Sequence, residues 1–247
     1  PVKFNGETLA EAESAGPMPL GKRTDLRDLP LVTIDGADAR DYDDAVWAAP
    51  DEKIPGGWHL IIAIADVVSY VKPGYALDRS AEERGTSVYF PDHVVPMLPE
   101  ALSNGWCSLV PNEDRPCLAA EIRIDAQGNT RSHRFHRGLM RSAARLTYEQ
   151  VQTARDGYPD EKTEPLLKAV IRPLYGAYEA LARRRDKRGT LDLDLTELQI
   201  SLGEDGHVSA IEPRIRLDSH RLIEEFMITA NVAAAESLEA KGAPVMY

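Results

Sequence analysis

The pattern of apolar and polar residues predicts a sheet built from short strands. Residues 31–34, 44–48 and 59–66 are apolar runs bounded by turn-forming residues, as is typical of buried strands. Residues 118–124 and 130–139 flank one turn, and residues 198–202 and 207–211 flank another. Each of these pairs predicts a β-hairpin.

Longer segments carry apolar residues at helical spacing and predict helices at residues 76–84, 147–154, 164–185 and 220–241. We expect Asp218 or Ser219 to cap the last helix and Gly242 to end it. Strands and helices alternate irregularly, and hairpins recur. The expected fold class is therefore α+β, with a mixed or antiparallel sheet core and flanking helices.

The composition is that of a globular protein, and the length suits one large domain or two small ones. The chain has 247 residues, of which 43% are hydrophobic and 28% are charged. Residues 1–24 are expected to form an irregular lead-in, and residues 25–247 the domain. No apolar run reaches the length of a membrane span and the start lacks a signal-peptide pattern, so we expect a cytoplasmic protein with no membrane association. In that compartment Cys107 and Cys117 are expected to be reduced, buried thiols.

The net charge of −11 argues against a module that binds nucleic acid through phosphate contacts alone. It does not argue against a nuclease, because a metal bound by carboxylates reverses the local charge. Two basic clusters, residues 131–145 and 183–188, are each expected to be a solvated surface.

Five aspartates fall within ten residues directly after the first apolar run: Asp35, Asp38, Asp41, Asp43 and Asp44. Oxygen ligands without Cys or His indicate Mg²⁺ or Mn²⁺ rather than zinc. An acidic surface turn is the simpler alternative. An EF-hand calcium loop is excluded, because the glycine required at its sixth position is missing in both registers.

The segment DLRDLPLVTIDGADARDYDDAV at residues 25–46 closely resembles the signature of the ribonuclease II/ribonuclease R family. The resemblance continues in family order through AIADV (63–67), VYFP (88–91), VPMLP (95–99), LS (102–103), CSL (107–109), NEDRP (112–116) and HRLIEEFMITAN (220–231). It covers nearly the whole chain, and the bacterial ribonuclease R branch is the most similar.

The resemblance implies a processive, hydrolytic 3′→5′ exoribonuclease of the exoribonuclease II type, which uses two metal ions to degrade single-stranded RNA to nucleoside 5′-monophosphates. The implied cofactor is Mg²⁺, with Mn²⁺ as a substitute. The implied domain is an RNB-type catalytic domain without its C-terminal part. The family's OB-fold RNA-binding domains and an arginine near the scissile phosphate have no counterpart here. We therefore expect a fragment whose partners are RNA and the remainder of its own polypeptide.

The same resemblance assigns the site residues. Metal binding and catalysis are carried by Asp35, Asp41, Asp43 and Asp44, with Asp43 tied most directly to cleavage and Asp38 not required. RNA contacts are assigned to Tyr89, Tyr148, Arg115 and one of Glu224 and Glu225. For Arg115, a structural salt bridge is an equal alternative.

One position departs from the family pattern. The phenylalanine that pairs with the clamp tyrosine corresponds here to Leu193, which can pack on a base without aromatic stacking. Two other functions stay open: an inactive member that acts as an RNA-binding or interaction module, and a metal-dependent phosphoesterase for a small molecule. Tyr89 and Tyr148 favour a base-lined channel over the second of these.

Overall fold

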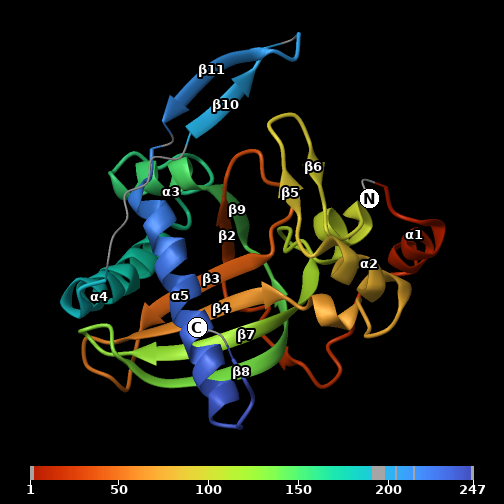
Figure 1. Ribbon diagram of the computed structural model, residues 1–247. Helices are drawn as coiled ribbons and strands as arrows, with labels where there is room; N and C mark the ends of the chain where they lie inside the picture. The colour runs from red at the N-terminus through yellow and green to blue at the C-terminus, as the bar shows by residue number, and fades with distance from the viewer. Residues whose placement is uncertain (1–2, 191–197, 204, 214, 246–247) are drawn as a thin grey trace.

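A seven-stranded mixed sheet forms the centre of the computed structural model (Figure 1), which describes residues 3–190, 198–203, 205–213 and 215–245. Its strands follow the order β1-β8-β7-β4-β3-β2-β9. Their bounds are β1 (Thr24–Asp25), β2 (Val32–Asp35), β3 (Asp44–Pro50), β4 (Trp58–Ala65), β7 (Asp114–Ile124), β8 (Thr130–Arg141) and β9 (Ala144–Thr147). The edge strands β1 and β9 pair in parallel with β8 and β2, and the other pairs are antiparallel.

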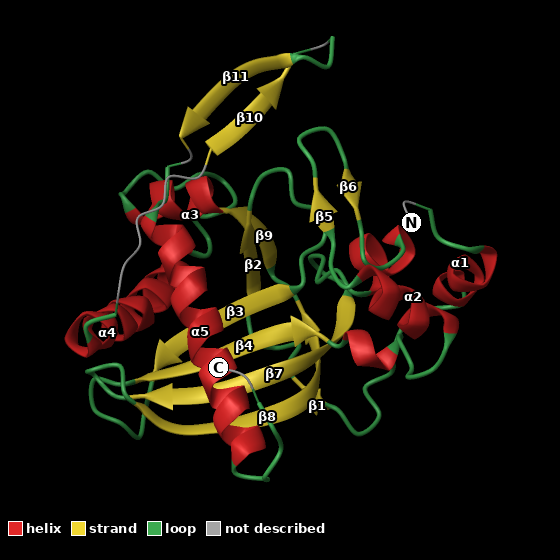
Figure 2. Ribbon diagram, viewed as in Figure 1, coloured by secondary structure: helices red, strands yellow, loops and turns green. Residues whose placement is uncertain are grey.

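Helices cover both faces of the sheet (Figure 2), and the predicted α+β class is confirmed. One face packs against α3 (Tyr148–Arg155), the short helix η3 (Leu167–Ile171), α4 (Arg172–Arg188) and α5 (Asp218–Glu239). Phe226 of α5 is fully buried in this core. The approach of α4 depends on Gly176, because a Cβ there would lie 2.3 Å from the Trp58 ring.

The opposite face packs against α1 (Gly6–Glu13), α2 (Ala76–Arg84), η1 (Val67–Ser69) and η2 (Ala101–Trp106). The expectation of an irregular lead-in was wrong for α1. Asn5 caps this helix by accepting a hydrogen bond from the Thr8 amide at 2.8 Å, and Ala12 is buried in the core. The helix was missed because its eight residues are too few to show a clear period.

Two small hairpins stand outside the main sheet: β5 (Val88–Tyr89) with β6 (Val94–Val95), and β10 (Leu198–Leu202) with β11 (Val208–Pro213). The predicted hairpin at β10–β11 is confirmed. The predicted cap of α5 was wrong, because Leu217 holds the N-cap position and its amide donates to Nδ1 of His220 at 3.1 Å.

Both cysteines are buried free thiols, and burial raises the pKa of each to about 12. Within the described ranges, no helix combines the length and apolarity that crossing a bilayer requires.

Candidate active site

The sheet brings the two ends of the acidic segment together. Asp35 ends β2 and Asp44 begins β3, its antiparallel neighbour. The other edge of β2 pairs with β9, where Asp35 lies opposite Thr147. Because Thr147 directly precedes α3, the start of that helix is held beside the aspartates.

Electrostatic coupling shows that the sequence-predicted aspartates share one environment. Loss of surrounding water raises the pKa of Asp43, although its residue surface is exposed, and the charges of Asp41 and Asp35 raise it further. Burial, followed by the charges of Asp43 and Asp35, raises the pKa of Asp44 to about 7. A cluster in which like charges oppose one another's ionisation is stabilised by a bound cation.

The donor set fits a hard divalent cation. The Oδ2 atom of Asp44 is buried and has no hydrogen-bond partner among the described residues. In the described part of the chain, however, no three acidic, His or Cys side chains converge closely enough to hold a metal ion. Protein donors engage two of the carboxylates, since Asp35 accepts from the Gly36 amide at 2.7 Å and Asp41 from Tyr89. Metal binding therefore requires these carboxylates to reorient.

Tyr89 connects the β5–β6 hairpin to the acidic loop. Its hydroxyl donates to Oδ2 of Asp41 at 3.0 Å, while 65% of its surface stays exposed. Burial, the hydrogen bond and the acidic charges raise the pKa of Tyr89, so its hydroxyl stays protonated as a donor. The neighbouring Phe90 is 49% exposed and stacks on His93, with ring centroids 4.8 Å apart. The exposed ring of Tyr89 therefore lies beside the carboxylates, with Phe90 next to it in the chain.

Tyr148 lies at the first position of α3 and stacks on His220 of α5, with ring centroids 3.9 Å apart and planes 17° from parallel. His220 was not among the site residues predicted from the sequence. Its ring accepts the Leu217 amide at Nδ1, which leaves the proton of the neutral ring on Nε2. The signal was its place at the start of the motif at residues 220–231.

The adjacent glutamates of α5 point in different directions. Glu225 is 5% exposed and accepts a hydrogen bond from Arg185 of α4 at 3.0 Å. Glu224 is half-buried and pairs with Arg216, which precedes the helix. Glu224 follows His220 by four residues, so the two share a helix face. This places Glu224, rather than Glu225, on the side of Tyr148.

Arg115 is buried and supports the acidic loop from within the protein. Its Nε donates to the Ser108 carbonyl at 3.0 Å, and its guanidinium pairs with Glu113 at 2.8 Å. The Ser108 hydroxyl accepts a hydrogen bond at 3.2 Å from the amide of Tyr42, the residue between Asp41 and Asp43 in the chain. In this conformation the guanidinium forms a structural salt bridge, which was the alternative to an RNA contact. An RNA contact by Arg115 stays a prediction.

Arg145 of β9 holds the loop from the other side. Its guanidinium donates to the carbonyls of Ala37 and Ala39 at 3.2 and 3.0 Å and lies 4.3 Å from the centre of the Tyr42 ring. Nothing in the sequence pattern linked this arginine to the loop, because Arg145 and Ala39 are 106 residues apart in the chain. Leu193, the predicted clamp position, lies outside the described residues.

The other arginines of the first basic cluster face carboxylates. Arg131 pairs with Asp125 at 2.7 Å, Arg134 with Glu121 at 3.1 Å, Arg137 with Asp66 at 4.0 Å, and Arg141 with Asp114 at 2.7 Å. Their charges are offset within the protein, which agrees with the predicted solvated surface.

Comparison with known proteins gives a consistent result. The profile of the RNB domain matches residues 23–247. Ribonuclease R of Vibrio parahaemolyticus is 45% identical over 244 residues, 98% of this chain and 28% of that protein. Ribonuclease R of Escherichia coli K12 is 46% identical over 243 residues, 98% of this chain and 29% of that protein. The chain thus spans less than a third of the length of these curated relatives.

A solved structure of Mycoplasma genitalium RNase R, in complex with ribose-methylated single-stranded RNA, has the same fold. It superposes with a TM-score of 0.91 at 29% identity, and the match covers 97% of this chain and 38% of that chain. The acidic site, the fold and the profile match over residues 23–247 lead to one conclusion: the chain belongs to the RNB domain family.

Proposed function

We propose that this chain is the catalytic part of a hydrolytic 3′→5′ exoribonuclease that degrades single-stranded RNA processively to nucleoside 5′-monophosphates. The observation that carries the proposal is the coupled set of Asp35, Asp41, Asp43 and Asp44, with the hydroxyl of Tyr89 anchored on Asp41. The relatives named ribonuclease R, and the RNase R bound to single-stranded RNA, support RNA as the substrate.

Mg²⁺, or Mn²⁺ in its place, is the proposed cofactor, held by the four aspartates. Two such ions, when bound, supply an activated water and offset charge on the leaving oxygen. The residues of this chain shape the rest of the site. Asp43 is proposed to act closest to the scissile phosphate, and the buried, unpartnered oxygen of Asp44 gives the set a further ligand.

The aromatic residues are proposed to hold the 3′ end of the RNA. Base stacking on Tyr89 is independent of sequence, as an enzyme that degrades every sequence requires. Tyr148 and Glu224 are proposed to contact the terminal riboses, whose 2′-hydroxyl distinguishes RNA from DNA. Loss of that contact would relax the preference for RNA.

A pair of substitutions in one loop tests the function. Single-stranded RNA labelled at either its 5′ or its 3′ end is incubated with Mg²⁺ and the wild type, Asp43→Asn or Asp38→Asn. Asp38→Asn is the matched control, since it removes the same charge from an exposed residue of the same loop. We expect mononucleotides from the 3′ end with the wild type and the control, and none with Asp43→Asn.

Internal cleavage, or equal activity of the two variants, would contradict the proposal. RNA binding without products would favour the inactive binding module instead. The assay is repeated with the full-length protein, because the flanking OB-fold domains and the rest of the polypeptide are proposed partners. The boundary at residues 24/25 and the cytoplasmic location stay predictions.

A further inference from the structure

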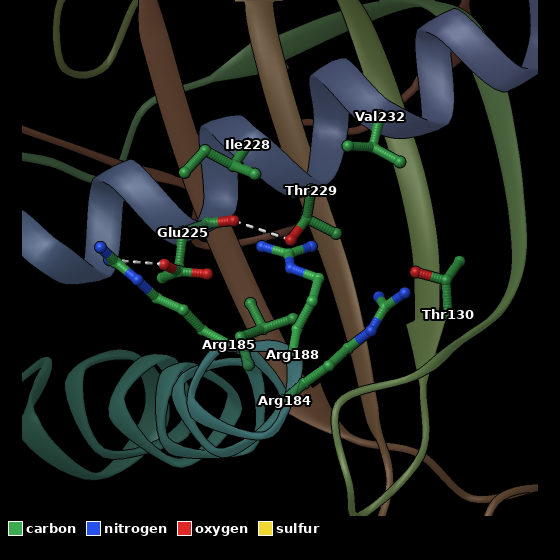
Figure 3. Close-up of a pocket in the computed structure, with 9 residues that line it drawn as sticks. Thr130, Arg184, Arg185, Arg188, Glu225, Ile228, Thr229 and Val232 are labelled. Carbon is green, nitrogen blue, oxygen red and sulfur yellow. Dashed lines mark hydrogen bonds and ion pairs between the residues drawn. The ribbon is translucent and has the colours of Figure 1, made fainter. Parts of the chain in front are cut away.

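A small cleft lies where the C-terminal end of α4 meets α5 and the start of β8 (Figure 3). We call it the arginine cleft. Its polar lining consists of Arg184, Arg185 and Arg188 from α4, Glu225 and Thr229 from α5, and Thr130 from β8. Figure 3 shows the three arginine side chains directed toward α5 and β8. The cleft contains none of the four aspartates or the exposed aromatic residues of the candidate active site.

Positive charge exceeds negative charge in the cleft. Arg185 is engaged by Glu225 at 3.0 Å. Arg184 donates to the Gly128 carbonyl at 3.4 Å and Arg188 to the Thr190 hydroxyl at 3.1 Å, both uncharged acceptors. Neither of these two arginines forms an ion pair with a carboxylate within the described residues, although the charge of Arg188 opposes the rise that burial causes in the pKa of Glu225. They differ in this from the arginines of β8, each of which faces an acidic side chain.

The size of the cleft limits what it binds. Its volume of about 30 Å³ is far too small for a nucleobase and leaves space only for a compact group at its mouth. Guanidinium groups supply directed N–H donors that match the oxygens of a phosphate. Thr130 and Thr229 line the same cleft. The Thr229 hydroxyl donates to the Glu225 carbonyl at 2.7 Å, so the arginines supply the donors for a phosphate.

We propose that the arginine cleft binds one phosphate group of an RNA strand, through Arg184 and Arg188, outside the catalytic centre. The identity of the strand rests on the proposed function. The cleft and the stack of His220 on Tyr148 share α5, because Glu225 follows His220 by five residues. Glu225 faces α4 rather than Tyr148, so an RNA whose 3′ end reaches the aspartates would contact the cleft by passing around α5.

Salt dependence of RNA binding tests the proposal. Affinity of a fluorescent single-stranded RNA is measured by anisotropy at several salt concentrations, with Asp43→Asn in every protein to prevent cleavage. We expect Arg188→Gln to weaken binding about tenfold, because a charge-assisted contact is lost. It should also reduce the slope of log K against log salt by about 0.7, the value for one phosphate on a single strand.

Lys187→Gln is the matched control, because it removes the same charge from the adjacent exposed residue of α4. We expect its slope to equal that of the parent protein. Arg188→Lys keeps the charge and should restore most of the slope. Circular dichroism confirms that each variant is folded. Equal slopes for Arg188→Gln and Lys187→Gln would overturn the proposal.

Titration with free phosphate and adenosine monophosphate distinguishes binding of an RNA phosphate from binding of a small anion. Each is titrated while the guanidinium N–H signals of Arg184 and Arg188 are followed by NMR. Shifts caused by RNA at lower concentration than by either small anion support the proposal. Shifts caused only by the small anions would overturn the assignment to RNA. If RNA is hydrolysed but neither signal moves, the proposed function stands and the cleft proposal fails.

Discussion

Replacement of Arg145 should disorder the acidic loop and weaken its affinity for metal. The side chain contributes two hydrogen bonds to loop carbonyls and one cation–π contact with Tyr42. A hydrogen bond that involves a charged group contributes about 1.5–3 kcal/mol, and an exposed cation–π contact about 0.5–1 kcal/mol. Both hydrogen bonds come from one nitrogen of a half-buried side chain, so we take the low end, about 2 kcal/mol in total.

A change of about 2 kcal/mol corresponds to about a thirtyfold shift in the population of the ordered loop. The loop carries Asp41 and Asp43, so metal binding must restore that order. We therefore expect the dissociation constant for Mg²⁺ to rise in Arg145→Ala by up to about thirtyfold, the full factor being reached when the loop of the metal-free variant is mostly disordered. Arg145→Lys should fall between this variant and the wild type, because lysine keeps the charge but cannot reproduce the planar contact.

Isothermal titration calorimetry with Mg²⁺ measures this effect without relying on enzymatic activity. Arg131→Lys serves as the control, since Arg131 pairs with Asp125 at the far end of β8. Urea denaturation without metal should show a smaller loss for Arg145→Ala than the metal-binding effect, because the loop is local. The reasoning is refuted if Mg²⁺ affinity is unchanged, or if the whole loss appears as global destabilisation.

Two further predictions concern stability. Gly176→Ala should lower the free energy of unfolding by about 1–3 kcal/mol through overpacking, since the new Cβ would lie 2.3 Å from Trp58; in urea denaturation Gly6→Ala, with open space around it, should show no loss, and equal losses would contradict this account. Burial raises the pKa of Glu121, but hydrogen bonds from His136 and Arg134 outweigh it and lower the pKa from 4.5 to about 2. This carboxylate should stabilise the fold by about 1–2 kcal/mol after solvent screening, fully above pH 4.5, with loss as the pH falls toward 2; a stability difference between wild type and Glu121→Gln that is constant from pH 7 to about 3 would refute it.

The sequence alone determined the central strands β2, β3, β4, β7 and β8, the β10–β11 hairpin, helices α2 to α5 and the location of the acidic loop. These features depend on local information: apolar periodicity, turn residues and a dense run of aspartates. The sequence did not predict the short strands β1, β5, β6 and β9. The resemblance also predicted Tyr89 and Tyr148 as RNA-contacting residues. In the structure Tyr89 donates to Asp41, and Tyr148 follows Thr147, which lies opposite Asp35. The prediction was wrong for the lead-in, because α1 is too short to show a clear period. It was also wrong for the cap of α5, because leucine is an unusual N-cap residue.

Only the tertiary structure decided which distant side chains meet. The choice between Glu224 and Glu225 depends on how α5 is rotated against α4, which its packing on the sheet sets. The contact of Arg145 with the loop arises because β9 pairs in parallel with β2. The basic residues divide in the same way: those on β8 pair with carboxylates of β7 or of the loops after β4 and β7, whereas Arg184 and Arg188 form no such pair within the described residues. Composition cannot reveal such differences, because they depend on three-dimensional neighbours rather than on residue type.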